Sequence, residues 1–277
     1  MRISLRNEED IYARVVVGAD GSAGRSAAYV GVTLDQVDLG LEIELPTPAD
    51  QRAYWENRIL IDWGTVPGGY AWVFPKGDLL SVGVIAERGE PERTRAYLDE
   101  FLSRHRLDPE TAVVSSGHLT RCRTADSPLY RDRVLVAGDA AGLLDPWTRE
   151  GISFALRSGT MAGQAAASAA QAASPAEAAA ALREYAEQVA ATLAPEMAAG
   201  RLFLHAYARH PRAFFLAVRL IPVAWKLVVR SITGEASLAD MTKQPLGRVL
   251  LLFFGDKSFG GASFGRIRRS GRQAPRG

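Results

Sequence analysis

The chain has 277 residues, of which 47% are hydrophobic and 23% are charged. This composition fits a globular protein of one large or two small domains, and it excludes a mainly disordered, collagen-like or disulfide-stapled chain. The single cysteine, Cys122, excludes an intrachain disulfide and a cysteine-rich metal site, and the four histidines do not group at metal-ligand spacing. The net charge of +2 is too small to indicate nucleic acid as a partner.

The first ten residues, MRISLRNEED, are charged and lack the apolar core of a signal peptide. The longest apolar stretch, residues 213–229, is interrupted by Arg219 and Lys226 and falls short of the ~20 residues that a spanning helix needs. These features predict a cytoplasmic protein.

The first half of the chain reads as strands followed by one helix. Residues 11–17 (IYARVVV) predict a β-branched strand that runs into the glycine turn GADGSAGR. Alternation over 39–45 predicts a half-exposed strand, and residues 57–63, 69–75 and 79–85 predict an antiparallel meander. Helical spacing over 92–106 then places four apolar side chains on one face: Tyr97, Leu98, Phe101 and Leu102.

The second half opens with a short apolar strand at 133–137, which ends in GDAAGLLDP. Residues 150–173 are rich in helix formers, and a capping box formed by Ser174 and Glu177 starts a further helix at Pro175. Helical patterns continue to about residue 230. Residues 265–277 contain five arginines and no acids, and they predict a mobile basic tail.

Two glycine-rich segments, about 120 residues apart, carry the chemistry. In each, a hydrophobic strand delivers an aspartate, Asp20 or Asp139, beside glycines at its carboxyl end, where ligands bind in open α/β sheets. Such an aspartate accepts hydrogen bonds from ribose hydroxyls, and the helix that opens near Gly151 presents a positive dipole end that stabilises a reduced flavin. For either segment alone, the alternative is a glycine turn whose aspartate caps the next helix.

This pair of segments resembles the second and third FAD fingerprints of the flavoenzymes that include aromatic hydroxylases and geranylgeranyl reductases. Between them, residues 69–76 (GYAWVFPK) resemble the YxWxFP segment of geranylgeranyl reductases, and 80–84 also fit. The resemblance covers about residues 10–165. It implies an enzyme that reduces isoprenoid double bonds of lipids or their precursors with FAD, itself reduced by NAD(P)H or a ferredoxin-type donor.

The resemblance also implies roles for particular residues. The FAD contacts it implies are Gly18, Asp20, Gly21, Arg25, Gly138, Asp139, Ala140, Gly142, Pro146, Gly151 and Ile152. It further implies that Tyr70, Trp72 and Phe74 line an apolar channel for the isoprenoid, although a sheet core is an equal alternative for these aromatics. It identifies no catalytic proton donor and no metal ligand.

The implied fold is α/β, or α+β overall, in four parts. Residues 1–32 and 113–173 form a partial, Rossmann-like FAD-binding domain, and residues 33–112 form an antiparallel-sheet substrate domain. Residues 174–264 form a C-terminal helical region, and 265–277 the tail.

Two departures from the family pattern matter. Arg149 replaces the glycine that usually precedes EGI, and its guanidinium either lies beside the flavin or points to solvent. No G-x-G-x-x-G occurs, and Gly18-x-x-Gly21-x-x-Gly24 does not replace it, because its spacing is wrong and no clear helix follows. The N-terminal βαβ unit is therefore expected to be missing, which leaves a sheet edge open to a partner chain that supplies it.

Three alternatives follow: a reductase, an FAD-dependent monooxygenase, and a truncated non-catalytic remnant that needs a partner. The apolar helices between residues 203 and 254 form either a layer over the sheet or a face that binds the inner surface of a membrane. In the second case Trp225, Lys226 and the arginine tail lie at the headgroups. Cys122 lies between Arg121 and Arg123, which lower its pKa if they are close, but a structural cysteine is the commoner case.

Overall fold

The protein is described by a computed structural model over residues 1–4, 8–63, 66, 68–89 and 91–244. The strands are β1 (Arg2–Ile3), β2 (Ile11–Tyr12), β3 (Val16–Gly18), β4 (Leu34–Pro46), β5 (Leu60–Asp62), β6 (Tyr70–Lys76), β7 (Leu79–Glu87), β8 (Val114–Arg123), β9 (Tyr130–Arg131) and β10 (Val134–Val136). The helices are α1 (Ser26–Val30), α2 (Arg52–Trp55), α3 (Pro91–Arg104), α4 (Ile152–Gln171), α5 (Pro175–Thr192), α6 (Ala194–Arg209), α7 (Pro211–Leu220), α8 (Pro222–Ile232) and α9 (Leu238–Lys243). Short 3-10 turns are η1 (Ala49–Gln51), η2 (Pro109–Thr111) and η3 (Gly138–Ala141).

A five-stranded antiparallel sheet has the order β5-β6-β7-β4-β8. The meander predicted over residues 57–85 is confirmed by β5, β6 and β7, which pair in sequence. Strand β8 is not predicted, because its sequence VSSGHLTRCR is polar and its first half is exposed, so only its pairing with β4 makes it a strand. Strand β8 therefore belongs to the larger sheet, although it follows the domain boundary expected at residue 113.

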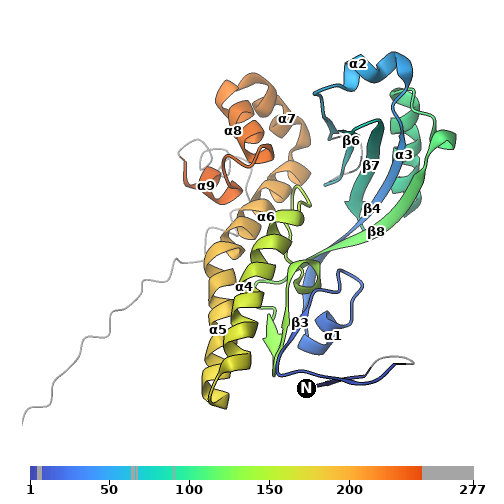
Figure 1. Cartoon of the computed structure of the whole chain (residues 1–277). Helices are drawn as coiled ribbons and strands as arrows, with labels where there is room; N and C mark the ends of the chain where they lie inside the picture. Colours follow the sequence, from blue (N-terminus) through green and yellow to red (C-terminus); the bar gives the residue numbers. More distant parts are fainter. Residues whose placement is uncertain (5–7, 64–65, 67, 90, 245–277) are drawn as a thin grey trace, which may run out of the picture.

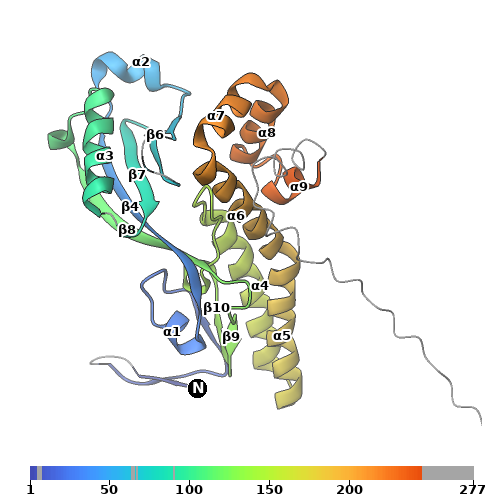
Figure 2. The same ribbon diagram turned by 180° about the vertical axis from the view of Figure 1, so that it is seen from behind.

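Helix α3 covers one face of this sheet, and α7 and α8 stand on the opposite side of it (Figures 1 and 2). The apolar face predicted for α3 is confirmed, because all four of its predicted side chains are buried. They pack into a core cluster with residues of β6 and β7, such as Val73, Val82 and Val84. The sheet is therefore sealed on the α3 side.

A smaller sheet of order β3-β10-β9 lies beside the long helices α4 and α5 (Figure 1). The single strand predicted over residues 11–17 is wrong, because the chain forms β2, which pairs with β1, and then β3. A short helix, α1, does follow the first glycine turn, contrary to expectation. Tyr185 of α5 donates a hydrogen bond of 2.7 Å to the carbonyl of Val136, which ties the helices to this sheet.

The predicted capping box is confirmed, since the amide of Glu177 donates to the Ser174 hydroxyl at 3.2 Å and Pro175 is the first residue of α5. Helices α6, α7 and α8 extend from α5 past the larger sheet (Figure 2). Among the described residues, no helix combines the length and the apolar character that a membrane span requires. The predicted basic tail at 265–277 lies outside the described residues.

Candidate flavin-binding site and apolar cavity

The two glycine-rich segments converge, as their predicted common role requires. Strands β3 and β10 are parallel neighbours, with Val16 opposite Val134 and Gly18 opposite Val136. The amide of Ala137 donates to the carbonyl of Gly18 at 3.0 Å, directly beyond the strands. Asp20 and Asp139 therefore both follow the carboxyl ends of adjacent strands, at one edge of the small sheet.

The Asp20 carboxylate is already engaged within its own turn. Its Oδ2 accepts hydrogen bonds from the amides of Arg25 (2.7 Å) and Ser26 (3.0 Å), and its Oδ1 accepts from the Ser26 hydroxyl. A Cβ at Gly24 would lie 2.1 Å from the Asp20 Cγ, and Gly21 has φ of +74°. Asp20 therefore caps the start of α1, which is the alternative raised for an isolated glycine turn. A contact with FAD from this residue stays a prediction.

The Asp139 carboxylate is different, because it accepts no hydrogen bond from any described residue. Its Oδ1 would lie 3.2 Å from a Cβ at Gly151, so the carboxylate stands beside the start of α4. Burial raises the pKa of Asp139, and the charge of His118 opposes that shift. Asp139 is exposed at the strand end, so its carboxylate is free to accept hydrogen bonds from a ligand that brings hydroxyl donors, as the ribose or ribityl group of FAD does.

The η3 turn that holds Asp139 and the buried Ala140 requires glycine at both ends. Gly138 and Gly142 have φ of +55° and +65°, and a Cβ at Gly142 would lie 2.8 Å from the Arg123 amide nitrogen. The amide of Gly138 donates to the Ser158 hydroxyl at 2.9 Å, which joins the turn to α4. Backbone conformation and close packing both select glycine here.

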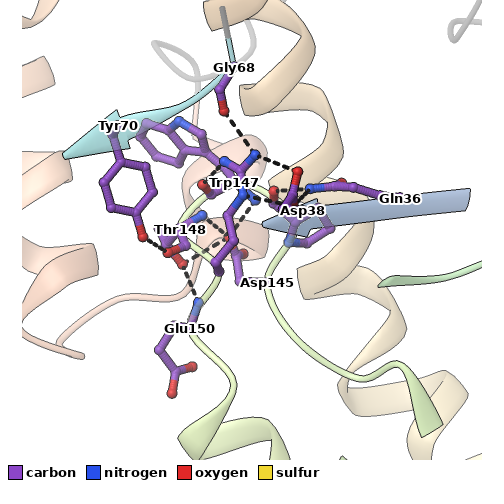
Figure 3. A network of polar contacts seen from close by, with 10 residues as sticks. Gln36, Asp38, Gly68, Tyr70, Asp145, Trp147, Thr148 and Glu150 are labelled. Atoms are coloured by element: carbon purple, nitrogen blue, oxygen red, sulfur yellow. Dashed lines mark hydrogen bonds and ion pairs between the residues drawn. The ribbon is translucent and has the colours of Figure 1, made fainter. Parts of the chain in front are cut away.

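The loop that connects η3 to α4 is organised by Asp145. Its Oδ1 accepts from the amides of Trp147 (2.9 Å) and Thr148 (2.6 Å) (Figure 3). Pro146 is buried, since a Cβ at Gly200 of α6 would lie 2.8 Å from its Cδ. The packing of α6 against Pro146 therefore holds this loop in place.

Arg149 does not point to the solvent, which corrects one of the two expectations for it, while a position beside the flavin stays a prediction. It is one of the residues that line the cavity described below. Its side chain is 4% exposed and binds both carboxylate oxygens of Asp38, with Nε–Oδ2 at 3.1 Å. It also donates to the carbonyls of Trp147 (2.7 Å) and Gly68 (2.8 Å) (Figure 3). The Arg149 φ of +58° is the left-handed conformation that a glycine adopts easily. Arg149 thus joins the loop to β4 of the larger sheet.

A cavity of about 770 Å³ lies between the 145–150 loop, β5, β6, the start of α4 and helices α8 and α9. Aromatic and aliphatic side chains dominate its walls: Ile61, Trp63, Tyr70, Phe74, Trp147, Phe154, Val228 and Leu238. Its polar groups include the ion pair of Arg157 with Glu196, at 2.9 Å. Volume and lining are those of a site for a mostly apolar ligand.

The three aromatics predicted to line a channel share one side of β6, but they differ in position. Tyr70 and Phe74 line the cavity, whereas Trp72 does not. Trp72 lies across Gly83 of β7, where a Cβ would come within 2.2 Å of its ring, and it donates to the Ser81 hydroxyl at 3.1 Å. The Tyr70 hydroxyl donates to the carbonyl of Thr148, and burial raises its pKa to about 12. Tyr70 therefore joins the cavity wall to the loop.

The start of α4 faces the same region. Ile152, predicted to lie against the flavin, is 76% exposed. The Glu150 carboxylate accepts from the amide and hydroxyl of Ser153, at 2.7 and 2.9 Å. The predictions missed Asp38, Trp63 and Trp147. For Asp38 the alternation of LDQVDLG was an available signal, but the two tryptophans lie in irregular segments without a pattern.

Comparison of the fold with solved structures defines the class of protein. A geranylgeranyl bacteriochlorophyll reductase-like protein from Thermoplasma acidophilum superposes with a TM-score of 0.59 at 22% identity, over 72% of this chain and 51% of that one. A flavin-dependent brominase superposes with a TM-score of 0.61 at 17% identity, over 91% of this chain and 64% of that one. The chain therefore has the fold shared by this flavin-dependent brominase and this reductase-like protein.

Sequence comparison is more specific. Residues 50–118 match the model of the geranylgeranyl reductase catalytic domain. Digeranylgeranylglycerophospholipid reductase 3 of Methanosphaera stadtmanae is 34% identical over 168 residues, which are 57% of this chain and 41% of that protein. The resemblance to the geranylgeranyl reductases, a family of oxidoreductases, is confirmed over this part of the chain. The chain spans less than two thirds of the length of each of these three relatives.

Proposed function

We propose that this chain belongs to an FAD-dependent oxidoreductase that reduces carbon–carbon double bonds of an isoprenoid lipid or its precursor. The observation that carries the proposal is the position of the cavity. Its apolar walls come from β5 and β6, within the segment that matches the reductase domain, and its floor is the loop that follows the GDAAG turn. An apolar site and a candidate flavin site thus meet at the 145–150 loop.

The residues present fit the flavin in one half of its site. The unpaired Asp139 carboxylate would accept hydrogen bonds from ribityl or ribose hydroxyls, and the positive φ of Gly138 and Gly142 gives the turn the shape that presents it. The positive dipole end of α4, which begins after Gly151, would stabilise negative charge on the ring, beside the Glu150 carboxylate that already accepts from the Ser153 amide. When bound, FAD would supply the hydride, and NAD(P)H or a ferredoxin-type donor would reduce it.

The cavity walls would recognise the substrate by shape. A prenyl chain has no polar groups to bind, so the aromatic rings of Tyr70, Phe74 and Trp147 would provide most of the contact. Trp72 would act indirectly, because its ring stacks on Phe74 with centroids 6.2 Å apart. The Tyr70–Thr148 hydrogen bond would hold this wall at a fixed distance from the flavin side of the loop.

The proposal includes the division of the chain into parts. Residues 1–32 and the segment from β9 to α4 would serve the flavin, and the five-stranded sheet, with β8 included, would serve the substrate. Strand β3 is at the edge of its sheet among the described residues, so a βαβ unit from another segment or a partner chain would complete the flavin site. The isoprenoid lipid would reach the cavity from a membrane surface.

The test begins with flavin binding to the full chain. Because only one half of the site is present, we expect the protein to bind added FAD weakly and Asp139→Asn to weaken this binding further, while Asp99→Asn on the exposed side of α3 leaves it unchanged. Reduced holoenzyme, supplied with a digeranylgeranylglycerol phospholipid, should form products heavier by pairs of hydrogens, as measured by mass spectrometry.

A cavity variant separates substrate recognition from flavin binding. Phe74→Ala should raise KM for the lipid and leave FAD binding intact, while Tyr54→Ala, on exposed α2, should change neither. If the reduced protein consumed oxygen and formed a hydroxylated product, the function would be that of a monooxygenase and not of a reductase. FAD binding only after addition of a separate nucleotide-binding chain would identify this chain as one part of a split enzyme, and no FAD binding under any condition would overturn the proposal.

A further inference from the structure

Helices α7 and α8 form a corner whose outer side is apolar. Six large hydrophobic side chains are exposed within eleven consecutive residues, and together they define the α7–α8 patch: Phe215, Leu216, Leu220, Ile221, Val223 and Trp225. Leu220 is 64% and Trp225 55% exposed. The opposite side of the corner, with Phe214, Val218 and Leu227, is buried in the aromatic cluster around Trp147. The α7–α8 patch is therefore distinct from the side of these helices that packs against the rest of the protein.

The charged residues of the segment that carries the patch have one sign. Residues 205–234 contain five arginines and lysines and no aspartate or glutamate. Arg212, Arg219 and Lys226 are exposed on the two helices that carry the patch, and none of them forms an ion pair with a described residue. Such a surface attracts an anionic partner and repels a second copy of itself. Interleaved bulky apolar and basic side chains on short helices are typical of segments that lie in a lipid headgroup region.

Helix length decides the manner of binding. Helix α7 has 10 residues and α8 has 11, so each is about 15 Å long, half the thickness of a bilayer core. Proline begins both helices and turns the chain between them. The corner can therefore lie along a bilayer surface but cannot cross it.

The inner side of α8 connects the patch with the cavity. Val228, about one turn beyond Trp225, and Ser231, about one turn further along α8, line the cavity wall. Figure 1 shows α7 and α8 at the end of the molecule that also carries the larger sheet. A bilayer that held the outer side of α8 would therefore lie one helix diameter from the apolar cavity.

We propose that the α7–α8 patch docks the protein on an anionic lipid surface, with Trp225 and the neighbouring apolar side chains inserted between headgroups. Arg212, Arg219 and Lys226 contact the phosphates. The inference rests on the proposed function, which explains why a lipid would be delivered at this surface. Binding to the lipid surface itself requires no catalysis. Vesicle binding therefore tests the patch separately from the reductase activity.

The experiment is co-sedimentation of the full chain with phosphatidylcholine vesicles that contain or lack phosphatidylglycerol. We expect binding to the anionic vesicles, weakened by salt. The triple variant Arg212→Gln, Arg219→Gln, Lys226→Gln should lose roughly fivefold in partition coefficient for each cation removed. The matched control is Arg183→Gln on the exposed side of α5, which should bind as the wild type does.

The apolar part is tested with Leu220→Gln and Trp225→Gln, which should also reduce binding, against Leu156→Gln on α4 as the control. All of these side chains are exposed, and circular dichroism checks that each variant folds. Brominated lipids should quench the tryptophan fluorescence of the wild type more than that of the Trp225→Phe variant.

Absence of binding to anionic vesicles would overturn the proposal. Binding that the triple variant, Leu220→Gln and Trp225→Gln all retain would also overturn it, because another part of the chain would then carry the binding. A concentration-dependent dimer that Leu220→Gln dissociates would also overturn it, since the patch would then be an interface between copies. Vesicle binding without reductase activity would leave the docking surface intact and count only against the proposed function.

Discussion

Arg149 and Asp38 form a buried, bidentate ion pair that connects the loop after the GDAAG turn with β4 of the larger sheet. Gln36, two residues along β4, donates to the same carboxylate at 2.7 Å and to the Pro146 carbonyl at 2.9 Å. The cavity floor is thereby fixed to the sheet that forms the cavity wall.

Loss of this ion pair should be costly. Arg149→Ala leaves the Asp38 carboxylate buried without its cation, which typically costs about 3–5 kcal/mol in the free energy of unfolding. Arg149→Gly should be less harmful than Arg149→Ala, by about 1 kcal/mol, because glycine adopts φ of +58° without strain. Urea unfolding measures both. Arg104→Ala, which removes the exposed pairs with Asp62 and Glu100, should cost under about 1 kcal/mol, and a similar loss for Arg104 and Arg149 would contradict the argument.

Gly142 and Gly77 provide a matched pair for separating backbone strain from steric contact. Both have φ of +65°, but a Cβ at Gly142 would lie 2.8 Å from the Arg123 amide nitrogen, while a Cβ at Gly77 meets nothing within 4 Å. Gly77→Ala should cost about 1–2 kcal/mol from conformation alone. Gly142→Ala should cost clearly more, as measured by thermal or urea unfolding, because the contact is with backbone. Equal losses would show that the η3 turn can move.

Asp139 should make stability depend on pH in a definite direction. Burial raises its pKa in the folded state above the ordinary value of 3.8, so the folded state holds this proton more tightly than the unfolded state. The wild type should therefore lose stability relative to Asp139→Asn as the pH rises from about 4 through the folded pKa, and the difference should then level off. Urea unfolding at a series of pH values measures it, with Asp99→Asn as the control. A wild type that gains stability relative to Asp139→Asn as the pH rises would refute this assignment.

Cys122 should be unreactive in the folded protein. Burial, with a smaller contribution from Asp38, raises the pKa of the thiol to about 12, although Arg121 and Arg123 flank it in the sequence. A disulfide reagent at pH 8 should therefore react at the rate of unfolding. Ser115→Cys, on the exposed part of the same strand, should react at once. Rapid modification of Cys122 in the native protein would contradict the burial.

The residue patterns by themselves determined the local elements and the family resemblance. The α3 face from Tyr97 to Leu102, the capping box at Ser174 and the meander of β5 to β7 all follow from periodicity and cap chemistry, which act within a few residues. The GDAAG turn and the YAWVFP strand were sufficient to indicate a geranylgeranyl reductase relative, because glycine at positive φ and a strand-end aspartate are local requirements.

Only the tertiary structure decided how these elements work together. Asp20 and Asp139 look alike in the sequence, yet Asp20 is engaged by its own turn while Asp139 is left without a partner, since the following residues fold differently. The partner of Arg149 is 111 residues away, and β8 is a strand only because β4 lies beside it. Contacts between distant segments leave no periodic trace, because each depends on the shape and charge of a surface that exists only after the chain has folded.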